Sequence, residues 1–233
     1  MKNILLLADG DELPELIGMF HRVDATARVT GVSTIEELTA ATENAGDDLR
    51  LLAFCTDVIV PKTILNRLNG PAYNVHPGPP QVRGVYPSVF ALYQGIRRFG
   101  ATLHELAEEV DSGTIVAVDY KDLPDGMDRL KTEMLARDMV TTLLKRMAPA
   151  LLNSDDPLPP IDEQWSGSAW SKRDFDDLCR LPEDITQAEY DRRYNAVGEG
   201  PDHALYFERF DRRFALVPPN FVGPIVKGGR QVG

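Results

Sequence analysis

The sequence predicts an α/β fold in which helices flank a largely parallel, twisted sheet, followed by a small α+β C-terminal extension. Short, continuous apolar runs recur along the first part of the chain, as expected of strands that are covered on both faces. Segments with a helical pattern separate these runs, which favours parallel strands joined by crossover helices. A proline-rich break at residues 153–160 then interrupts the pattern. We therefore expect a main domain at residues 1–152, a linker at 153–163 and an extension at 164–233.

Strands and helices alternate in the first eighty residues. Apolar runs at residues 4–8, 27–32, 51–54 and 72–75 are predicted strands. Helices are expected at residues 12–21, after Ser33 and at 61–68. Ser33 and Glu36 have the spacing of a capping box, and Pro61 suits the first turn of a helix.

The rest of the main domain is predicted to hold a helix at residues 87–95, strands at 101–106 and 114–120, and one long helix at 128–152. Beyond the linker, a short helix is expected near residue 185 and a hairpin at residues 204–217. Trp165 and Trp170 are expected to be packing anchors, and residues 227–233 a frayed tail. The hairpin offers an edge for pairing with a second copy, so a homodimer is one expected assembly.

Composition excludes several classes of protein. The net charge is −11 and the sequence pI is about 4.8, which argues against broad binding to a phosphate backbone, so no nucleic-acid partner is expected. Cys55 and Cys179 lack the spacing of a zinc motif or a disulfide framework, which suits a reducing cytoplasm. The apolar run at the N-terminus is too short for a signal peptide or a membrane span. We therefore expect a cytoplasmic protein with no metal and no membrane partner.

The most informative segment runs Asn-Val-His-Pro-Gly-Pro-Pro-Gln-Val-Arg-Gly, from Asn74 to Gly84, where a predicted strand becomes a loop. Residues i and i+2 of a strand point to the same face, so Asn74 and His76 can reach one substrate atom together. Such a pair can stabilise the oxyanion that forms when a nucleophile attacks a carbonyl carbon. A second marker, Asp111-Ser112-Gly113, lies in an acidic loop that opens into another apolar strand. Taken singly, each of these residues is more often a turn or loop residue.

In this order, the residues resemble the folate-dependent formyltransferase family, which includes glycinamide ribonucleotide, methionyl-tRNA and sugar-nucleotide N-formyltransferases. That family carries an Asn-x-His-Pro-Ser-Leu-Leu-Pro-x-x-x-Gly signature and a later Asp in an Asp-x-Gly turn. The residues that match are Asn74, His76, Pro77, Asp111 and Gly113, and Gly84 lies one position before the place of the signature's glycine. The likeness runs from about Leu51 to about Leu152. It implies a Rossmann-like formyltransferase fold for this part of the chain.

The resemblance implies transfer of a formyl group from 10-formyltetrahydrofolate, the expected cofactor, to the primary amine of a small molecule. Asn74 would stabilise the oxyanion and position the donor, and His76 would contact the oxyanion and shuttle a proton. Asp111 would favour the charged form of His76 and orient the amine or a water molecule. The chemistry of these three side chains requires no metal and no covalent enzyme intermediate.

In the family the pterin lies in a cleft lined mainly by backbone groups. The resemblance carries this role to two segments, whose residues are Thr56, Asp57, Val58, Ile59, Val60, Glu108, Glu109 and Val110. Pro77, Gly78 and Tyr86 are further candidates for substrate binding.

The other histidines and Cys55 carry weaker signals. Alternation along the strand before Asp111 does not decide whether His104 faces the site, and His21 and His203 are expected at the surface. Cys55 is expected to be a buried side chain, since a nucleophile requires a base partner.

The chain also departs from the family. Gly78-Pro79-Pro80-Gln81 replaces Ser-Leu-Leu-Pro, which stiffens the loop and removes a hydroxyl group. Acidic residues after the first strand would repel a phosphate, which disfavours a role in purine synthesis. The larger C-terminal domain expected of the methionyl-tRNA enzyme is missing, and the charge does not suit tRNA. A small amine acceptor remains, with an amino sugar nucleotide as the leading example. The alternatives are hydrolysis of 10-formyltetrahydrofolate and folate binding without catalysis.

Overall fold

The computed structural model describes residues 3–43, 46, 48–154, 156–200 and 204–217. Its centre is a six-stranded sheet in the order β2-β1-β3-β4-β6-β7. Strands β2, β1, β3 and β4 run parallel, whereas β6 and β7 are each antiparallel to the strand before them. The predicted α/β class is therefore confirmed, with a mixed but mostly parallel sheet. The strands are β1 (Asn3–Leu7), β2 (Val29–Val32), β3 (Leu49–Phe54), β4 (Tyr73–His76), β6 (Arg98–Glu105) and β7 (Ile115–Asp122).

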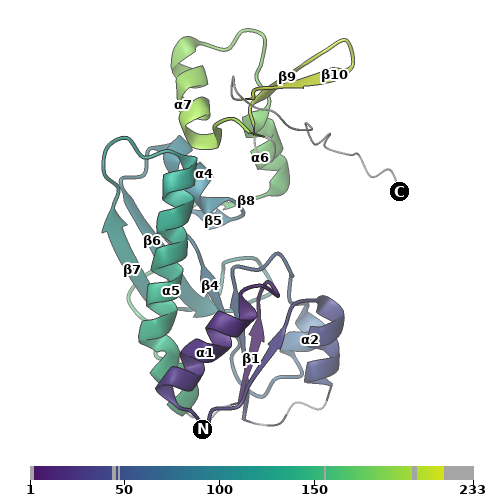
Figure 1. The fold of residues 1–233 in the computed structure, drawn as a ribbon, viewed down its shortest axis with the longest axis vertical. Helices are drawn as coiled ribbons and strands as arrows, with labels where there is room; N and C mark the ends of the chain where they lie inside the picture. Colours follow the sequence, from purple (N-terminus) through teal and green to yellow (C-terminus); the bar gives the residue numbers. More distant parts are fainter. Residues whose placement is uncertain (1–2, 44–45, 47, 155, 201–203, 218–233) are drawn as a thin grey trace.

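Helices cover both faces of this sheet. Helix α1 (Leu13–Val23) lies beside the long helix α5 (Arg129–Asn153), whereas α2 (Ile35–Thr42) lies on the other side of β1 (Figure 1). The short helix α3 (Lys62–Leu65) contributes Ile64 to the same hydrophobic cluster as Leu38 of α2, and α4 (Pro87–Gln94) packs with α5. Within the described residues, no helix is long and apolar enough to cross a membrane.

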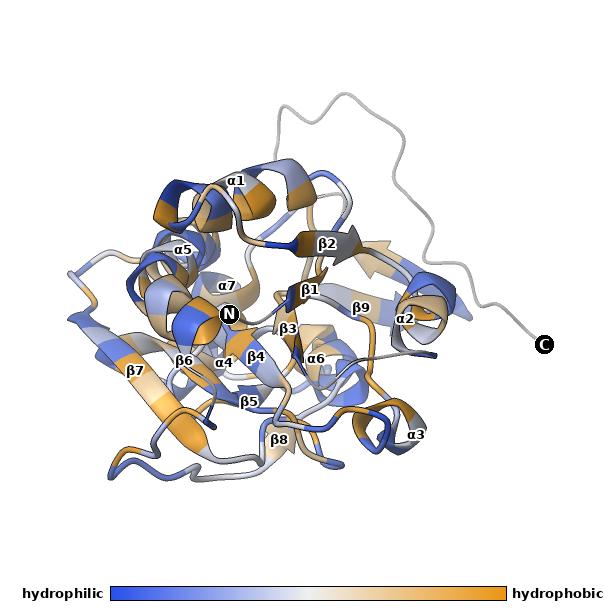
Figure 2. Ribbon diagram, turned by 90° about the horizontal axis from the view of Figure 1, so that it is seen from below, coloured by the Kyte–Doolittle hydropathy of each residue, from blue (hydrophilic) through white to orange (hydrophobic). Residues whose placement is uncertain are grey.

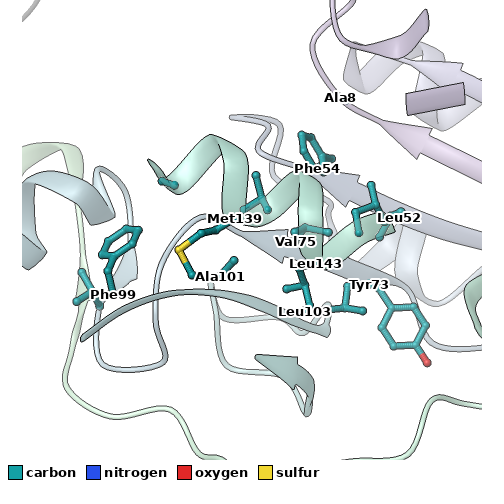
Figure 3. Close-up of a cluster of buried hydrophobic side chains, with 14 of the residues drawn as sticks. Ala8, Leu52, Phe54, Tyr73, Val75, Phe99, Ala101, Leu103, Met139 and Leu143 are labelled. Atoms are coloured by element: carbon teal, nitrogen blue, oxygen red, sulfur yellow. The ribbon is translucent and has the colours of Figure 1, made fainter. Parts of the chain in front are cut away.

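Two hydrophobic clusters explain why the strands read as continuous apolar runs. In β1, Ile4 and Leu6 face the cluster under α1 and α5, while Leu5 and Leu7 face the cluster under α2. Figure 3 shows the first cluster, which brings together Leu52, Phe54, Tyr73, Val75 and Leu103 of three strands with Met139 and Leu143 of α5. Along α1 and α2, hydrophilic residues alternate with hydrophobic ones, as expected of helices with one buried side (Figure 2).

The start of α2 differs from the prediction by one residue. The N-cap is Thr34, whose hydroxyl accepts a hydrogen bond from the backbone N–H of Glu37. The Glu37 carboxylate in turn accepts from the backbone N–H of Ser33, at 2.7 Å. Both Ser33 and Thr34 precede an acidic residue by three positions, so the local pattern fits either start. The structure adopts the second start.

The C-terminal extension lies at the end of the molecule remote from the N-terminus (Figure 1). It contains β8 (Ala169–Trp170), α6 (Lys172–Cys179), α7 (Gln187–Val197) and the hairpin of β9 (Tyr206–Arg209) and β10 (Arg212–Ala215). Helix α7 and the hairpin correspond to predicted elements. Helix α6 was not predicted, and neither was the pairing of β8 with β5 (Arg83–Gly84). Residues 227–233 and His203 lie outside the described residues.

The chain between α5 and β8 is held against the main domain. The buried guanidinium of Arg50 donates to the carbonyl of Leu151 at the end of α5, at 2.8 Å. The backbone N–H of Leu158 donates to the hydroxyl of Tyr73 at 2.8 Å, and that of Ile161 donates to the carbonyl of Ile115 at 3.1 Å. These contacts hold the segment beside β4 and the first residue of β7, and they place Trp165 next to Gly113.

Candidate functional site

The ends of β4 and β6 and the turn before β7 bring four polar side chains together. Asn74 and His76 lie on β4, His104 lies opposite Asn74 on the antiparallel strand β6, and Asp111 lies in the β6–β7 turn. All four line one cleft of about 390 Å³. The three residues predicted to act together are therefore adjacent, and His104 lies beside them.

Both ring nitrogens of His76 face oxygen atoms. Its Nδ1 lies 3.3 Å from Oδ2 of Asp111, and its Nε2 donates to the carbonyl of Val82 at 2.8 Å. This ring position depends on Gly78, because a Cβ atom there would lie 2.5 Å from Nε2 and 2.7 Å from Cβ of Pro87. The glycine that replaces the serine of the related signature thus permits the turn of the imidazole towards Val82.

Asp111 holds a buried negative charge. Burial acts to raise the pKa of its carboxyl group, but His76, His104 and the backbone N–H of Gly84 outweigh that effect and lower the pKa to about 2. The Gly84 bond to Oδ2 measures 2.7 Å. Asp111 adopts a left-handed backbone with φ of 46°, which Asp and Asn tolerate better than most residues. The carboxylate is therefore ionised at neutral pH.

His76 is subject to opposing effects. Burial lowers the pKa of its imidazole, because a charged ring loses solvation inside the protein. Asp111 and the Val82 carbonyl act to raise that pKa, and His104 acts to lower it. The effect of burial prevails and the pKa of His76 lies below its ordinary value, so the ring exchanges its proton at a lower pH than an exposed histidine does.

The position of His104 was left open by the sequence. Its Nδ1 lies 2.7 Å from the carbonyl of Glu105, and its Nε2 lies 3.1 Å from Nδ2 of Asn74 and 3.2 Å from Oδ1 of Asp111. The hydrophobic pattern of a single strand does not predict that His104 lies beside Asn74, because this contact follows from the antiparallel pairing of β4 with β6. The sequence of this strand held no further signal, because Thr102 and Glu105 are polar residues of the same strand.

Trp165 packs against both imidazole rings of the site. Its ring centroid lies 5.8 Å from that of His76 and 4.9 Å from that of His104, both edge-on. Its indole N–H donates to the carbonyl of Gly113 at 2.7 Å. Trp170 stacks on Phe90 at 4.2 Å. Both tryptophans pack as expected, but the contact of Trp165 with the two imidazoles was not foreseen.

The segments assigned to the pterin by resemblance line the same cleft as the polar cluster. They are Thr56, Asp57, Val58, Ile59, Val60, Glu108, Glu109 and Val110. Pro77 and Tyr86 also line it. Gly78 lies behind His76, where its carbonyl accepts a hydrogen bond from the hydroxyl of Thr102 at 2.8 Å. Among the described residues that line this cleft, one is a lysine or arginine, namely Lys172. Its Nζ lies 3.0 Å from Oδ2 of Asp57.

The remaining candidates lie as follows. Cys55 lines the cleft with a φ of 47°, and burial raises the pKa of its thiol to about 12. A thiol that stays protonated is a poor nucleophile, which agrees with the expected packing role. His21 lies on the exposed side of α1. Among the described residues, no group of His, Cys, Asp and Glu side chains is arranged to hold a metal ion.

Several known proteins are similar to this chain in sequence or in fold. A model of the formyl transferase family matches residues 22–137. A sugar N-formyltransferase from a Shewanella species has a TM-score of 0.73 at 20% identity, covering 94% of this chain and 97% of that chain. An N-formyltransferase from Helicobacter canadensis, in complex with folinic acid and dTDP-3-aminofucose, has a TM-score of 0.68 at 14% identity, covering 91% and 85%. A search of curated proteins finds no match.

The methionyl-tRNA formyltransferase from Clostridium thermocellum is also similar, with a TM-score of 0.60 at 16% identity. The match covers 94% of this chain and 92% of that chain. The expected larger C-terminal domain therefore does not distinguish that enzyme from this chain. At these identities, the solved structures show a shared fold.

Proposed function

The chain belongs to the formyl transferase family, and on that premise we propose that it transfers a formyl group from 10-formyltetrahydrofolate to the primary amine of a small molecule. The observation that carries this proposal is the cluster of half-buried Asn74 with buried His76 and Asp111 in one cleft. When an amine attacks a formyl carbon, an amide donor can stabilise the oxyanion, and an imidazole with an ionised carboxylate can accept the proton that the amine loses.

The cleft suits a folate donor. The two segments that the resemblance assigns to the pterin line the cleft together with Asn74 and His76. A pterin edge carries several donors and acceptors, which backbone N–H and C=O groups can match without demanding particular side chains. The Helicobacter canadensis relative, solved with folinic acid, supports a donor of this class. When bound, the folate supplies the formyl group.

The polar cluster can manage the proton that the reaction releases. The amine loses one proton as its nitrogen bonds to the formyl carbon, and the donor nitrogen must gain one as its bond to that carbon breaks. His76 and Asp111, whose facing atoms lie 3.3 Å apart, are placed to hold this proton between the two events. The amide of Asn74 can donate to the oxygen that becomes negative.

The leading acceptor is an amino sugar nucleotide. The same relative, solved with dTDP-3-aminofucose, supports this class. Asp57, Glu108 and Glu109 make the described lining of the cleft acidic, so Lys172 is the group to which we assign the anionic part of such an acceptor. Lys172→Gln should then raise KM for a nucleotide-linked amino sugar and leave KM for the free amino sugar unchanged. An equal change for both acceptors would contradict the assignment.

The direct test is turnover of 10-formyltetrahydrofolate with and without a panel of amines, in which mass spectrometry identifies the formylated product. We expect tetrahydrofolate release only when an amine is present. Release without an amine would indicate the hydrolase, and binding of 5-formyltetrahydrofolate without release would indicate a folate-binding protein. His76→Ala should lower the transfer rate by about 10²–10⁴-fold. The matched control is His21→Ala, on the exposed side of α1.

We also propose that two copies associate through the hairpin. Phe207 and Phe214 pair across the hairpin, with ring centroids 5.2 Å apart, and are 47% and 41% exposed, and Phe210 at the turn is 82% exposed. A two-stranded hairpin with an uncovered apolar face is marginal in water, which favours burial of this face against a second copy. Light scattering should report a dimer, and Phe207→Ser with Phe214→Ser should yield a monomer. A monomeric unmodified chain would refute the proposal.

The proposed location is the cytoplasm. Cys55 and Cys179 are both free thiols, and neither is exposed. Free thiols persist in reducing compartments, where folate-dependent transfer would also find its donor. Fractionation of cells that express the tagged chain would test this location.

A further inference from the structure

The imidazole of His104 lies inside the site but has no role in the function proposed above. It is 1% exposed, and its Nδ1 lies 2.7 Å from the carbonyl oxygen of Glu105. Because a carbonyl oxygen only accepts hydrogen bonds, Nδ1 carries a proton. The other ring nitrogen, Nε2, is therefore the atom that gains or loses the titratable proton.

Nε2 lies between a hydrogen-bond donor and a hydrogen-bond acceptor. Nδ2 of Asn74 is 3.1 Å away, and Oδ1 of Asp111 is 3.2 Å away. Without a proton, Nε2 can accept from the amide of Asn74, but its lone pair then faces the carboxylate. With a proton, Nε2 can donate to Asp111, but its N–H then faces the N–H group of Asn74. With the amide in this orientation, neither protonation state satisfies both neighbours.

We propose that His104 is a positioning residue whose proton at Nε2 selects which end of the Asn74 amide faces the ring. When His104 is neutral, the amide nitrogen is bound to Nε2. When His104 is charged, a half-turn of the amide places Oδ1 of Asn74 beside Nε2, which then donates to Asn74 and Asp111. Both N–H bonds of Asn74 become free for the cleft. This inference rests on the proposed function in one respect, which is that the Asn74 amide donates a hydrogen bond to the oxyanion.

The surroundings allow the amide to turn more readily than the ring. The bond from Nδ1 to Glu105 and the edge-on contact with Trp165, at 4.9 Å and 88°, hold the imidazole in place. The described titratable groups that face His104 are Asp111 from the β6–β7 turn and His76 from β4. Trp165, from the segment after α5, brings no titratable group.

The first test is an NMR titration that does not depend on catalysis. The protein is labelled with ¹⁵N at asparagine side chains, and the Asn74 signals are identified from their loss in Asn74→Ser. We expect the two amide protons of Asn74 to shift with pH between about pH 5 and 9, and this response to vanish in His104→Gln. The control His21→Gln should retain it. Asn74 signals that do not respond to pH, or that respond equally in His104→Gln, would overturn the proposal.

The second test is kinetic. In His104→Gln, an amide replaces the ring and cannot titrate, so kcat/KM should fall about 10–100-fold and lose the ionisation due to His104. KM for the folate donor should stay within about threefold, because His104 is assigned no contact with it. A wild-type rate and pH profile in this variant would refute the role. If the unmodified protein transfers no formyl group, the proposed function fails, while the titration still decides whether His104 controls Asn74.

Discussion

Replacing Asp111 with Asn should destabilise the protein at neutral pH and leave its stability nearly unchanged in strong acid. Asn keeps the size of the side chain and tolerates the left-handed φ of 46°, so the change removes mainly the charge. An Ala at this position would add backbone strain, which makes it a poorer test. The amide oxygen of Asn can still accept the hydrogen bond from Gly84.

The magnitude follows from the pKa of the carboxyl group. In the folded protein it is about 2, against an ordinary value of 3.8, a difference of about 1.8. At 1.36 kcal/mol for each pKa unit, ionisation of Asp111 contributes about 2 kcal/mol to stability. Because the folded pKa lies below the unfolded one, this contribution is complete above about pH 4 and is lost as the pH falls towards 2.

The assay is urea unfolding of the unmodified protein and Asp111→Asn from pH 7 down to pH 2.5, followed by circular dichroism. The difference in unfolding free energy should be about 2 kcal/mol at pH 7 and should shrink steadily below pH 4. Asp125→Asn is the matched control, because that side chain is 93% exposed and should show no such difference. A deficit that stays constant across this pH range, or one below about 0.5 kcal/mol at pH 7, would refute the reasoning.

Three further changes test other features of the site. Gly78→Ser places a Cβ atom 2.5 Å from Nε2 of His76, so it should cost about 1–3 kcal/mol in urea unfolding and lower kcat, whereas Gly70→Ser, in open space, should do neither. The thiol of Cys55, with a pKa raised by burial to about 12, should react with iodoacetamide at pH 8 about 10²-fold more slowly than a free thiol, and rapid labelling would contradict this. Trp165→Phe retains an aromatic ring but loses the indole hydrogen bond, so a loss of about 1 kcal/mol in unfolding free energy is expected; no loss would mean that this bond is not needed.

Much of the fold could be predicted because its local patterns match its tertiary environment. The apolar run from Ile4 to Ala8 indicated a strand covered on both faces, and both hydrophobic clusters draw residues from it. Where the pattern fitted two alternatives, the prediction failed. The cap of α2 is Thr34 and not Ser33, and it is the Thr34 hydroxyl that accepts the hydrogen bond from the backbone N–H of Glu37. Helix α6 was not predicted, although Ser171 and Asp174 form a capping box at its start.

The sequence alone determined that Asn74 and His76 share a face, because they lie two residues apart on one strand, and that Asp111 belongs to the same ordered set. Only the tertiary structure decided which residues complete the site. His104 faces Asn74 because β6 pairs with β4 in one antiparallel register, and Trp165 reaches both histidines because its segment is bound to the edge of the sheet. Periodicity states which face of an element is buried, whereas register and long-range contacts arise from the packing of the whole chain.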